Sequence, residues 1–145
     1  MRGTKMDSSN IILLVEDNSD DVLLFKLALR NAKITYPLNV VTNGQEAVDY
    51  LSGTGQYADR EKYPLPFMIF LDLKTPCLDG FEVLAWIERR PMFQSIAVVA
   101  LSGSDEPKDH KRAYVLGGRF YLVKPPKPEE LRQVIDSLRD VSAGK

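Results

Sequence analysis

The sequence predicts an α/β protein with a doubly wound parallel β-sheet. The prediction rests on short apolar runs, amphipathic stretches between them, and their regular alternation along the chain. Apolar runs without polar interruption are typical of strands buried on both faces, as in a parallel sheet. Strands that alternate with helices form βαβ units. We therefore expect five parallel strands with the helices packed on the sheet.

Each expected strand is a short run of mostly Val, Ile, Leu or Phe, bounded by polar or turn residues. The second run is the weakest of the five. The strands are expected at Ile11–Val15, Leu38–Val41, Phe67–Leu71, Ala97–Leu101 and Phe120–Val123.

The segments between the strands have helical spacing. The first opens with Ser19, Asp20 and Asp21, capping or acidic residues that suit a helix N-terminus. The long connection Gly53–Pro66 is expected to be a surface loop without chemistry. Helices are expected at Ser19–Ala32, Gly44–Ser52, Asp79–Arg90, Asp105–Leu116 and Pro128–Ser142.

Composition and charge exclude several classes of protein. The 145 residues are 44% hydrophobic and 27% charged, which is typical of one soluble domain. Lys and Arg number 19 and Asp and Glu 20, so generic binding to a nucleic-acid backbone is not expected. Cys77 is the single cysteine, which excludes an internal disulfide and a Cys-based zinc site. His110 is the single histidine, which excludes a metal centre with several His ligands. We expect His110 to face solvent. No apolar run could span a membrane and the first ten residues lack an apolar signal core, so we expect a cytoplasmic protein without a membrane partner.

Charged and polar residues follow four of the expected strands. Glu16 and Asp17 come after the first, Asp72 after the third, Ser102 after the fourth and Lys124 after the fifth. Ligands of open α/β sheets bind beyond the C-terminal ends of the strands, so we expect these side chains to meet there. Each residue alone is ordinary as a helix cap or a surface charge, but all of them on successive strand ends favour a functional site.

The residue types at this edge indicate phosphoryl chemistry. Three carboxylates repel one another unless a cation lies among them, and Mg²⁺ takes oxygen ligands. The hydroxyl of Ser102 and the ammonium of Lys124 would lie beside these carboxylates and could donate hydrogen bonds to the oxygens of a phosphoryl group. An aspartate in this position can act as a nucleophile and form an acyl phosphate.

With these residues the sequence resembles the receiver domain of bacterial two-component response regulators. The resemblance covers about residues 10–138, and Asp20-Asp21-Val22 with the long insertion makes the chain most similar to single-domain regulators of cyanobacterial phytochromes. It implies a flavodoxin-like sheet with strand order 2-1-3-4-5. The motifs that carry it are Val15-Glu16-Asp17-Asn18, Leu71-Asp72-Leu73-Lys74-Thr75-Pro76 with Asp79-Gly80, Leu101-Ser102-Gly103 and Tyr121-Leu122-Val123-Lys124-Pro125.

The resemblance implies a metal site at the acidic residues. Asp17 and Asp72 are expected to bind Mg²⁺ directly, and Glu16 through a water molecule. The main-chain carbonyl of Lys74 is expected to supply a further ligand.

The resemblance also implies how a phosphoryl group is accepted and sensed. Asp72 is the expected phosphoacceptor, Lys124 is expected to pair with the phosphoryl group, and Ser102 to donate a hydrogen bond to it. Tyr121 matches an aromatic switch that turns inward as Ser102 moves toward the phosphate. The peptide bond between Lys124 and Pro125 is cis in the family.

We therefore expect a single receiver domain over residues 1–145, with a core of about 10–142 and no output domain. A histidine kinase or a histidine phosphotransfer protein would donate the phosphoryl group, and an unidentified downstream protein would read the conformational change. The protein is not expected to be an enzyme beyond slow autodephosphorylation. It is expected to be a monomer or a weak homodimer.

Two other functions use related folds. A phosphatase of the haloacid-dehalogenase type needs a second aspartate two residues after its nucleophile, where this chain has Lys74. A flavodoxin needs a phosphate loop rich in Gly and hydroxyl groups after the first strand, and the four carboxylates of residues 16–21 would repel a phosphate there. A degenerate receiver that only docks is disfavoured by the complete set of site residues.

Overall fold

A five-stranded parallel sheet forms the centre of the protein. The computed structural model describes the backbone of residues 10–143 and the side chains of residues 10–139. The strand order is β2-β1-β3-β4-β5, which confirms the predicted doubly wound topology. The strands are β1 Ile12–Val15, β2 Leu38–Val41, β3 Met68–Asp72, β4 Ala97–Ser102 and β5 Phe120–Val123.

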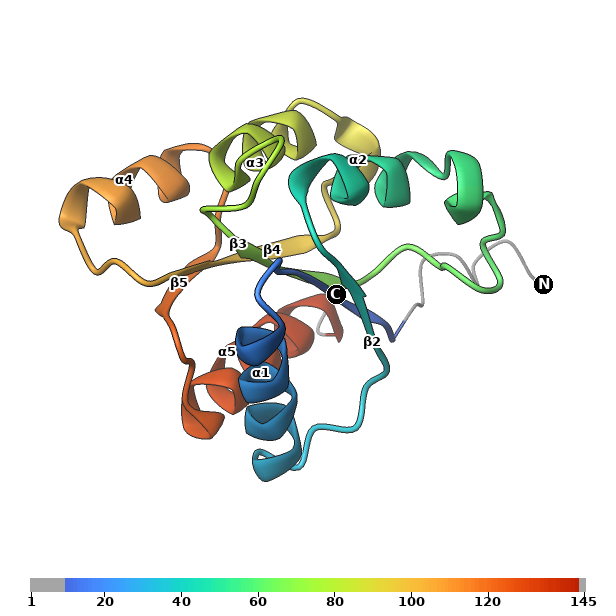
Figure 1. The fold of residues 1–145 in the computed structure, drawn as a ribbon. Coiled ribbons are helices and arrows are strands. Elements are labelled where there is room, and N and C mark those ends of the chain that lie inside the picture. The colour runs from blue at the N-terminus through green and yellow to red at the C-terminus, as the bar shows by residue number, and fades with distance from the viewer. Residues whose placement is uncertain (1–9, 144–145) are drawn as a thin grey trace.

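Helices cover both faces of this sheet, as Figure 1 shows: α2, α3 and α4 on one face, α1 and α5 on the other. The predicted helices are confirmed to within two residues at their ends. α3 begins after Asp79, whose side chain forms a capping box with Glu82. The helices are α1 Ser19–Asn31, α2 Gly44–Ser52, α3 Gly80–Glu88, α4 Pro107–Val115 and α5 Pro128–Ala143.

The core consists of two apolar layers separated by the sheet. Successive residues of β1 point to opposite faces, so that Leu13 and Val15 join the layer under α2 and α3, while Ile12 and Leu14 join the layer under α1 and α5. β1, β3 and β4 are buried along their whole length, whereas the edge strands β2 and β5 are partly exposed. Because these central strands are fully packed, the sheet holds the residues at their carboxyl ends in fixed positions.

The segment 53–66 differs from the plain surface loop expected from sequence. It contains a short 3₁₀ helix, η2 Gly55–Ala58, and Tyr57 is buried against Tyr50. The guanidinium of Arg60 donates hydrogen bonds to the main-chain carbonyls of Tyr50 and Leu51 at the end of α2. These contacts fasten the segment to α2. A second 3₁₀ helix, η3 Pro91–Phe93, was also not predicted.

No helix within residues 10–143 has the length and apolar character needed to cross a membrane.

Candidate functional site

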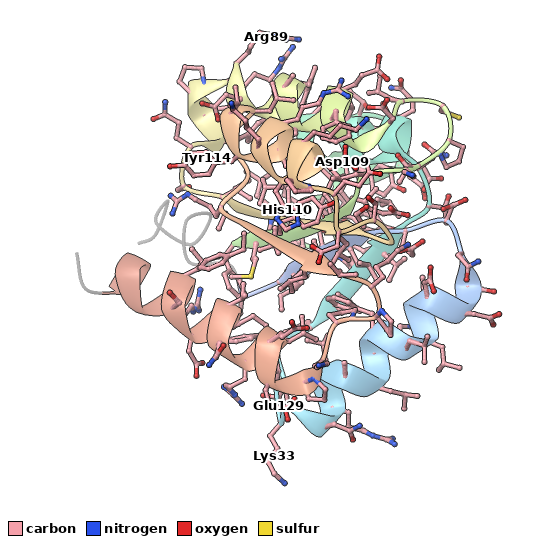
Figure 2. All side chains as sticks on the ribbon, turned by 90° about the vertical axis from the view of Figure 1, so that its left-hand side faces the viewer. Lys33, Arg89, Asp109, His110, Tyr114 and Glu129 are labelled. Carbon is pink, nitrogen blue, oxygen red and sulfur yellow. The ribbon has the colours of Figure 1, made fainter. Side chains whose placement is uncertain are left out.

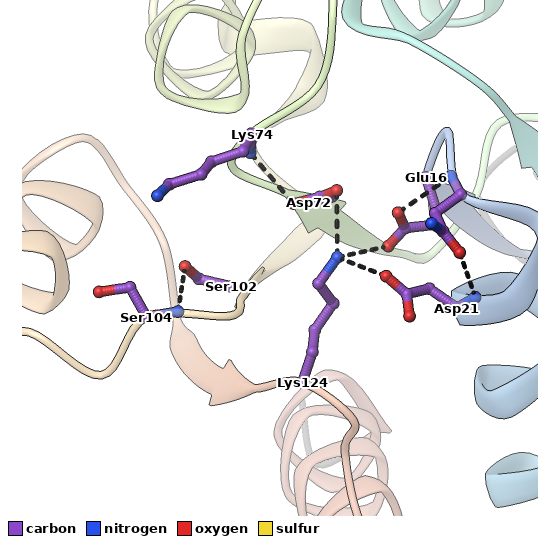
Figure 3. A network of polar contacts seen from close by, with 8 residues as sticks. Glu16, Asp21, Asp72, Lys74, Ser102, Ser104 and Lys124 are labelled. Carbon is purple, nitrogen blue, oxygen red and sulfur yellow. Dashed lines mark hydrogen bonds and ion pairs between the residues drawn. The ribbon is translucent and has the colours of Figure 1, made fainter.

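The predicted site residues meet at the carboxyl edge of the sheet. Glu16 and Asp17 follow β1, Asp72 and Ser102 end β3 and β4, and Lys124 follows β5. Parallel pairing aligns Val15 with Leu71, Asp72 with Leu101, and Ser102 with Val123, so the polar residues emerge side by side (Figure 3).

Three carboxylates gather at this edge. Glu16, Asp17 and Asp72 each offer an oxygen, and these three oxygens lie within 4.8 Å of one another. Glu16 and Asp72 are 2% and 3% exposed, whereas Asp17 is exposed. All three ligands are oxygens, two of them on buried side chains and one on an exposed side chain. Such a set fits a divalent cation that keeps some of its water ligands on the exposed side.

Lys124 is the cationic partner of these acids. Its Nζ lies 3.1 Å from Glu16 Oε1, 3.0 Å from Asp21 Oδ2 and 3.3 Å from Asp72 Oδ2. Burial by itself lowers the pKa of Lys124, but the hydrogen bond to Asp21 and the charge of Asp72 outweigh it and raise the pKa above its ordinary value. An ammonium has three N–H donors, and here each faces a carboxylate. The peptide bond from Lys124 to Pro125 is cis, as the resemblance implies.

Glu16 has the most perturbed carboxyl of the site. Burial, with the nearby charge of Asp72, raises the pKa of Glu16 from 4.5 to about 7, although Lys124 acts in the opposite direction. The charge on this side of the site is therefore in part relieved by a proton near neutral pH. A bound cation would compete with that proton.

Asp72 is oriented by two contacts, one at each oxygen. The main-chain N–H of Lys74 donates to Oδ1 at 3.0 Å, and Oδ2 faces Lys124. The loop after β3 folds back because the N–H of Gly80 donates to the carbonyl of Leu73. The Lys74 side chain is exposed and extends away from Asp72 and Glu16, on the side of Ser102 (Figure 3).

Ser102 and Tyr121 form the opposite side of the site. The hydroxyl of Ser102, 1% exposed, accepts a hydrogen bond from the N–H of Ser104 at 3.0 Å, which leaves its own proton available as a donor. The phenol of Tyr121 donates to the carbonyl of Ser104 at 2.6 Å. Tyr121 also packs against one core layer, so its phenol lies inward, next to the loop that follows Ser102. Burial raises the pKa of Tyr121, and a hydrogen bond with the Ser102 side chain opposes this.

Sequence reasoning missed two residues near the site. Asp21 was interpreted as an acidic residue of the first turn of α1, but it is also a partner of Lys124. His110 was expected to face solvent, but its ring stacks on Tyr121. The position of Asp21 in the first turn of α1, which starts at the same edge of the sheet, could have placed it beside the site. No sequence pattern links His110 to Tyr121.

Comparison with known proteins agrees with this geometry. The sequence profile of the response regulator receiver domain matches residues 12–136. Response regulator Rcp1 of Synechocystis is 35% identical over 135 residues, which are 91% of this chain and 90% of that protein. The probable methanogenesis regulatory protein FilR2 of Methanothrix harundinacea is 35% identical over 137 residues, 92% of this chain and 84% of that protein.

Solved structures show the same fold. The phosphorylated cyanobacterial phytochrome response regulator RcpA has a TM-score of 0.75 at 35% identity, over 92% of this chain and 93% of that one. The bacteriophytochrome response regulator RtBRR has a TM-score of 0.80 at 38% identity, over 90% of this chain and 78% of that one. These findings favour neither the phosphatase nor the flavodoxin.

Domains of this kind are signalling proteins that accept phosphoryl groups from histidine kinases or phosphotransfer proteins. The carboxylate, hydroxyl and ammonium groups at the sheet edge suit that role. The match over residues 12–136 and the phytochrome regulators among its relatives establish that the chain belongs to the response regulator receiver domain family.

Proposed function

We propose that Asp72 accepts a phosphoryl group from the phosphohistidine of a kinase or phosphotransfer protein. One observation carries the proposal: the Asp72 carboxylate lies between an acidic pair, Glu16 and Asp17, and the cation of Lys124, at the open edge of a rigid sheet. No other aspartate among the described residues has this combination of burial, cationic partner and neighbouring carboxylates.

The transfer exchanges one bond for another. An oxygen of Asp72 attacks phosphorus, the bond from phosphorus to the donor imidazole nitrogen breaks, and an acyl phosphate forms while the imidazole keeps the electron pair. Lys124 is already within reach of Asp72 and would turn a proton toward the phosphoryl oxygens. Ser102 accepts a hydrogen bond from Ser104 and would turn its own hydroxyl proton toward the phosphoryl oxygens.

The proposed cation is Mg²⁺, held by Asp17 and Asp72 directly, by Glu16 through water and by the main-chain carbonyl of Lys74. A related protein, Rcp1, has been crystallised in an Mn²⁺-bound form; it is 34% identical, with a TM-score of 0.72 over 90% of this chain and 92% of that one. When bound, such a cation supplies positive charge that offsets the negative charge of the transferring oxygens.

The proposed output is a change of conformation rather than turnover of a substrate. Ser102, drawn to the phosphoryl group, would carry the loop after β4 with it, and Tyr121 is bonded to that loop through Ser104. A downstream protein would read the surface formed by α4, β5 and α5. Slow hydrolysis of the acyl phosphate would reset the site.

The proposal is tested with a small phosphodonor, which needs no docking surface. Wild-type protein and the Asp72→Asn variant are incubated with acetyl phosphate and Mg²⁺, and intact masses are measured. We expect one added phosphoryl group on the wild type and none on Asp72→Asn.

Asp79→Asn is the matched control, because Asp79 is a half-buried cap of α3 and asparagine caps a helix equally well. This variant should be phosphorylated like the wild type. Equal phosphorylation of wild type and Asp72→Asn would refute the assignment.

A further inference from the structure

Helix α4 contacts the switch tyrosine through His110. The imidazole stacks on the Tyr121 ring with centroids 3.8 Å apart and planes 22° apart. Its Nε2 lies 2.7 Å from Asp105 Oδ1. Figure 2 faces this region, where His110 lies between α4 and β5. The side chain is 40% exposed, so the expected solvent-facing histidine is covered on one side by Tyr121.

These contacts form a closed circuit that includes the loop after β4. The phenol of Tyr121 donates to the carbonyl of Ser104, the ring of Tyr121 stacks on His110, and His110 is bonded to Asp105, the residue next to Ser104. The same Ser104 donates its N–H to the hydroxyl of Ser102. His110 is thus connected to the phosphate-binding hydroxyl through two routes, one through the Tyr121 ring and one through the loop.

We propose that His110 is a positioning residue for the switch: its stack holds Tyr121 inward beside Ser102 and so favours the arrangement that takes up a phosphoryl group. The inference rests on the proposed function of Asp72. For Tyr121 to turn outward, its ring must leave the imidazole and its hydroxyl must leave Ser104 together. A contact made in only one of two conformations shifts the population toward that conformation.

The stack differs from ordinary core packing in where it lies. His110 lies at the edge of α4 that faces β5 and its side chain is 40% exposed, whereas Ala113 is the buried residue of that helix. Removing the imidazole should therefore leave the core intact while releasing Tyr121. Only a role in positioning predicts that phosphorylation and the environment of Tyr121 change together.

The test compares His110→Ala with His110→Phe, which keeps an aromatic ring for the stack, and with Lys111→Ala as an exposed control on the same helix. Initial rates of phosphorylation by acetyl phosphate are measured with Mg²⁺ by intact mass. An aromatic pair of average strength corresponds to a rate about fivefold lower in His110→Ala. His110→Phe should restore most of the rate, and Lys111→Ala should match the wild type.

A second measurement reports on Tyr121 directly. Protein labelled with fluorotyrosine is studied by ¹⁹F NMR, with the Tyr121 signal identified by its absence in Tyr121→Phe. We expect this signal to shift in His110→Ala and to remain near its wild-type position in His110→Phe. Should His110→Ala fail to fold, His110→Leu, also without an aromatic ring, takes its place in both measurements.

Each outcome decides the inference. A normal rate with an unshifted Tyr121 signal in the non-aromatic variant overturns it, and so does an equal loss of rate in His110→Ala and His110→Phe. If wild-type protein takes up no phosphoryl group, the proposed function fails, and the Tyr121 signal alone then decides whether His110 holds the ring.

Discussion

At the scale of single residues, Lys124 is shared among more acids than the sequence indicated. Asp21 occupies one of its three N–H donors, yet Asp21 is the most exposed of the three acids that surround Lys124. A phosphoryl oxygen on Asp72 would need one of those donors. In the proposed function, Asp21 would therefore compete with the phosphoryl group for Lys124.

We expect Asp21→Asn to raise the steady-state level of phosphorylated protein, because a neutral amide oxygen holds the Lys124 ammonium more weakly than a carboxylate does and competes less with the phosphoryl oxygens. The level is measured by intact mass in acetyl phosphate and Mg²⁺. Asp20→Asn, an exposed aspartate in the same helical turn, is the control and should behave like the wild type. A level at or below that of the wild type in Asp21→Asn would contradict this competition.

Lys74 is expected to prolong the phosphorylated state. Its side chain extends away from Asp72 on the side of Ser102 (Figure 3), where the ammonium can obstruct water that approaches phosphorus from that side. Its attraction to the phosphoryl charge and its repulsion of a divalent cation largely cancel. Lys74→Ala should therefore lose phosphate faster, with little change in Mg²⁺ affinity. The time course of phosphate loss and a Mg²⁺ titration check this, and unchanged hydrolysis with altered Mg²⁺ affinity would refute it.

The carboxyl of Glu16 should make the stability of the metal-free protein depend on pH. Its pKa is 4.5 in the unfolded chain and about 7 in the folded protein, which therefore binds this proton more tightly. The free energy of unfolding should fall as pH rises from 4.5 to about 7, by at most about 3 kcal/mol, and this contribution is constant above that range.

Urea unfolding in a chelator, at pH 5 and pH 7.5, measures this dependence. Glu16→Gln should lack the fall because it has no carboxyl to ionise, whereas the exposed Asp20→Asn should keep it. The same pH dependence in Glu16→Gln and wild type would show that another group is responsible.

At the scale of elements, the first residue of α3 packs closely against the backbone at the end of β3. A methyl group on Gly80 would lie 2.4 Å from Leu73 Cα and 2.6 Å from the carbonyl oxygen of Asp72. Only glycine allows this approach, and it brings the loop that carries Lys74 back over Asp72.

Gly80→Ala should therefore lower the free energy of unfolding by about 2 kcal/mol and slow phosphorylation, since the backbone of Asp72 must shift. Urea unfolding and the acetyl phosphate assay measure the two effects. Gly103→Ala is the control for stability, because a methyl group there meets no atom within 4 Å. Equal stability of Gly80→Ala and wild type would mean that the loop accommodates the methyl group.

At the scale of the whole molecule, the fold brings together carboxylates that repel one another. Glu16, Asp17 and Asp72 come from two strand ends, and folding forces their oxygens to within 4.8 Å. Coulomb repulsion among them reduces stability, and a cation that binds only the folded protein restores it.

The melting temperature should therefore rise by a few degrees in about 10 mM Mg²⁺. Asp17→Ala should melt above the wild type in chelator, because it relieves the repulsion, and should show no rise with Mg²⁺. Asp20→Asn, which lies outside the cluster, serves as the control. A rise with Mg²⁺ that persists in Asp17→Ala would count against this ligand.

The sequence by itself determined the sheet, the helices and the side chains at the strand ends. Central strands buried on both faces read as unbroken apolar runs, and the weaker second run belongs to edge strand β2, which is partly exposed. Because parallel strands end at one edge, the sequence alone was enough to place Asp72 and Lys124 together.

Only the tertiary structure decided which partners those residues take. Asp21 and Lys124 are 103 positions apart, and their contact depends on how α1 sits relative to β5. The stack of His110 on Tyr121 likewise depends on how α4 packs, and the fastening of the 53–66 segment depends on Arg60 reaching the end of α2. Periodicity and capping report local hydrogen bonding and burial, whereas these contacts form between side chains whose positions are fixed by packing of separate elements.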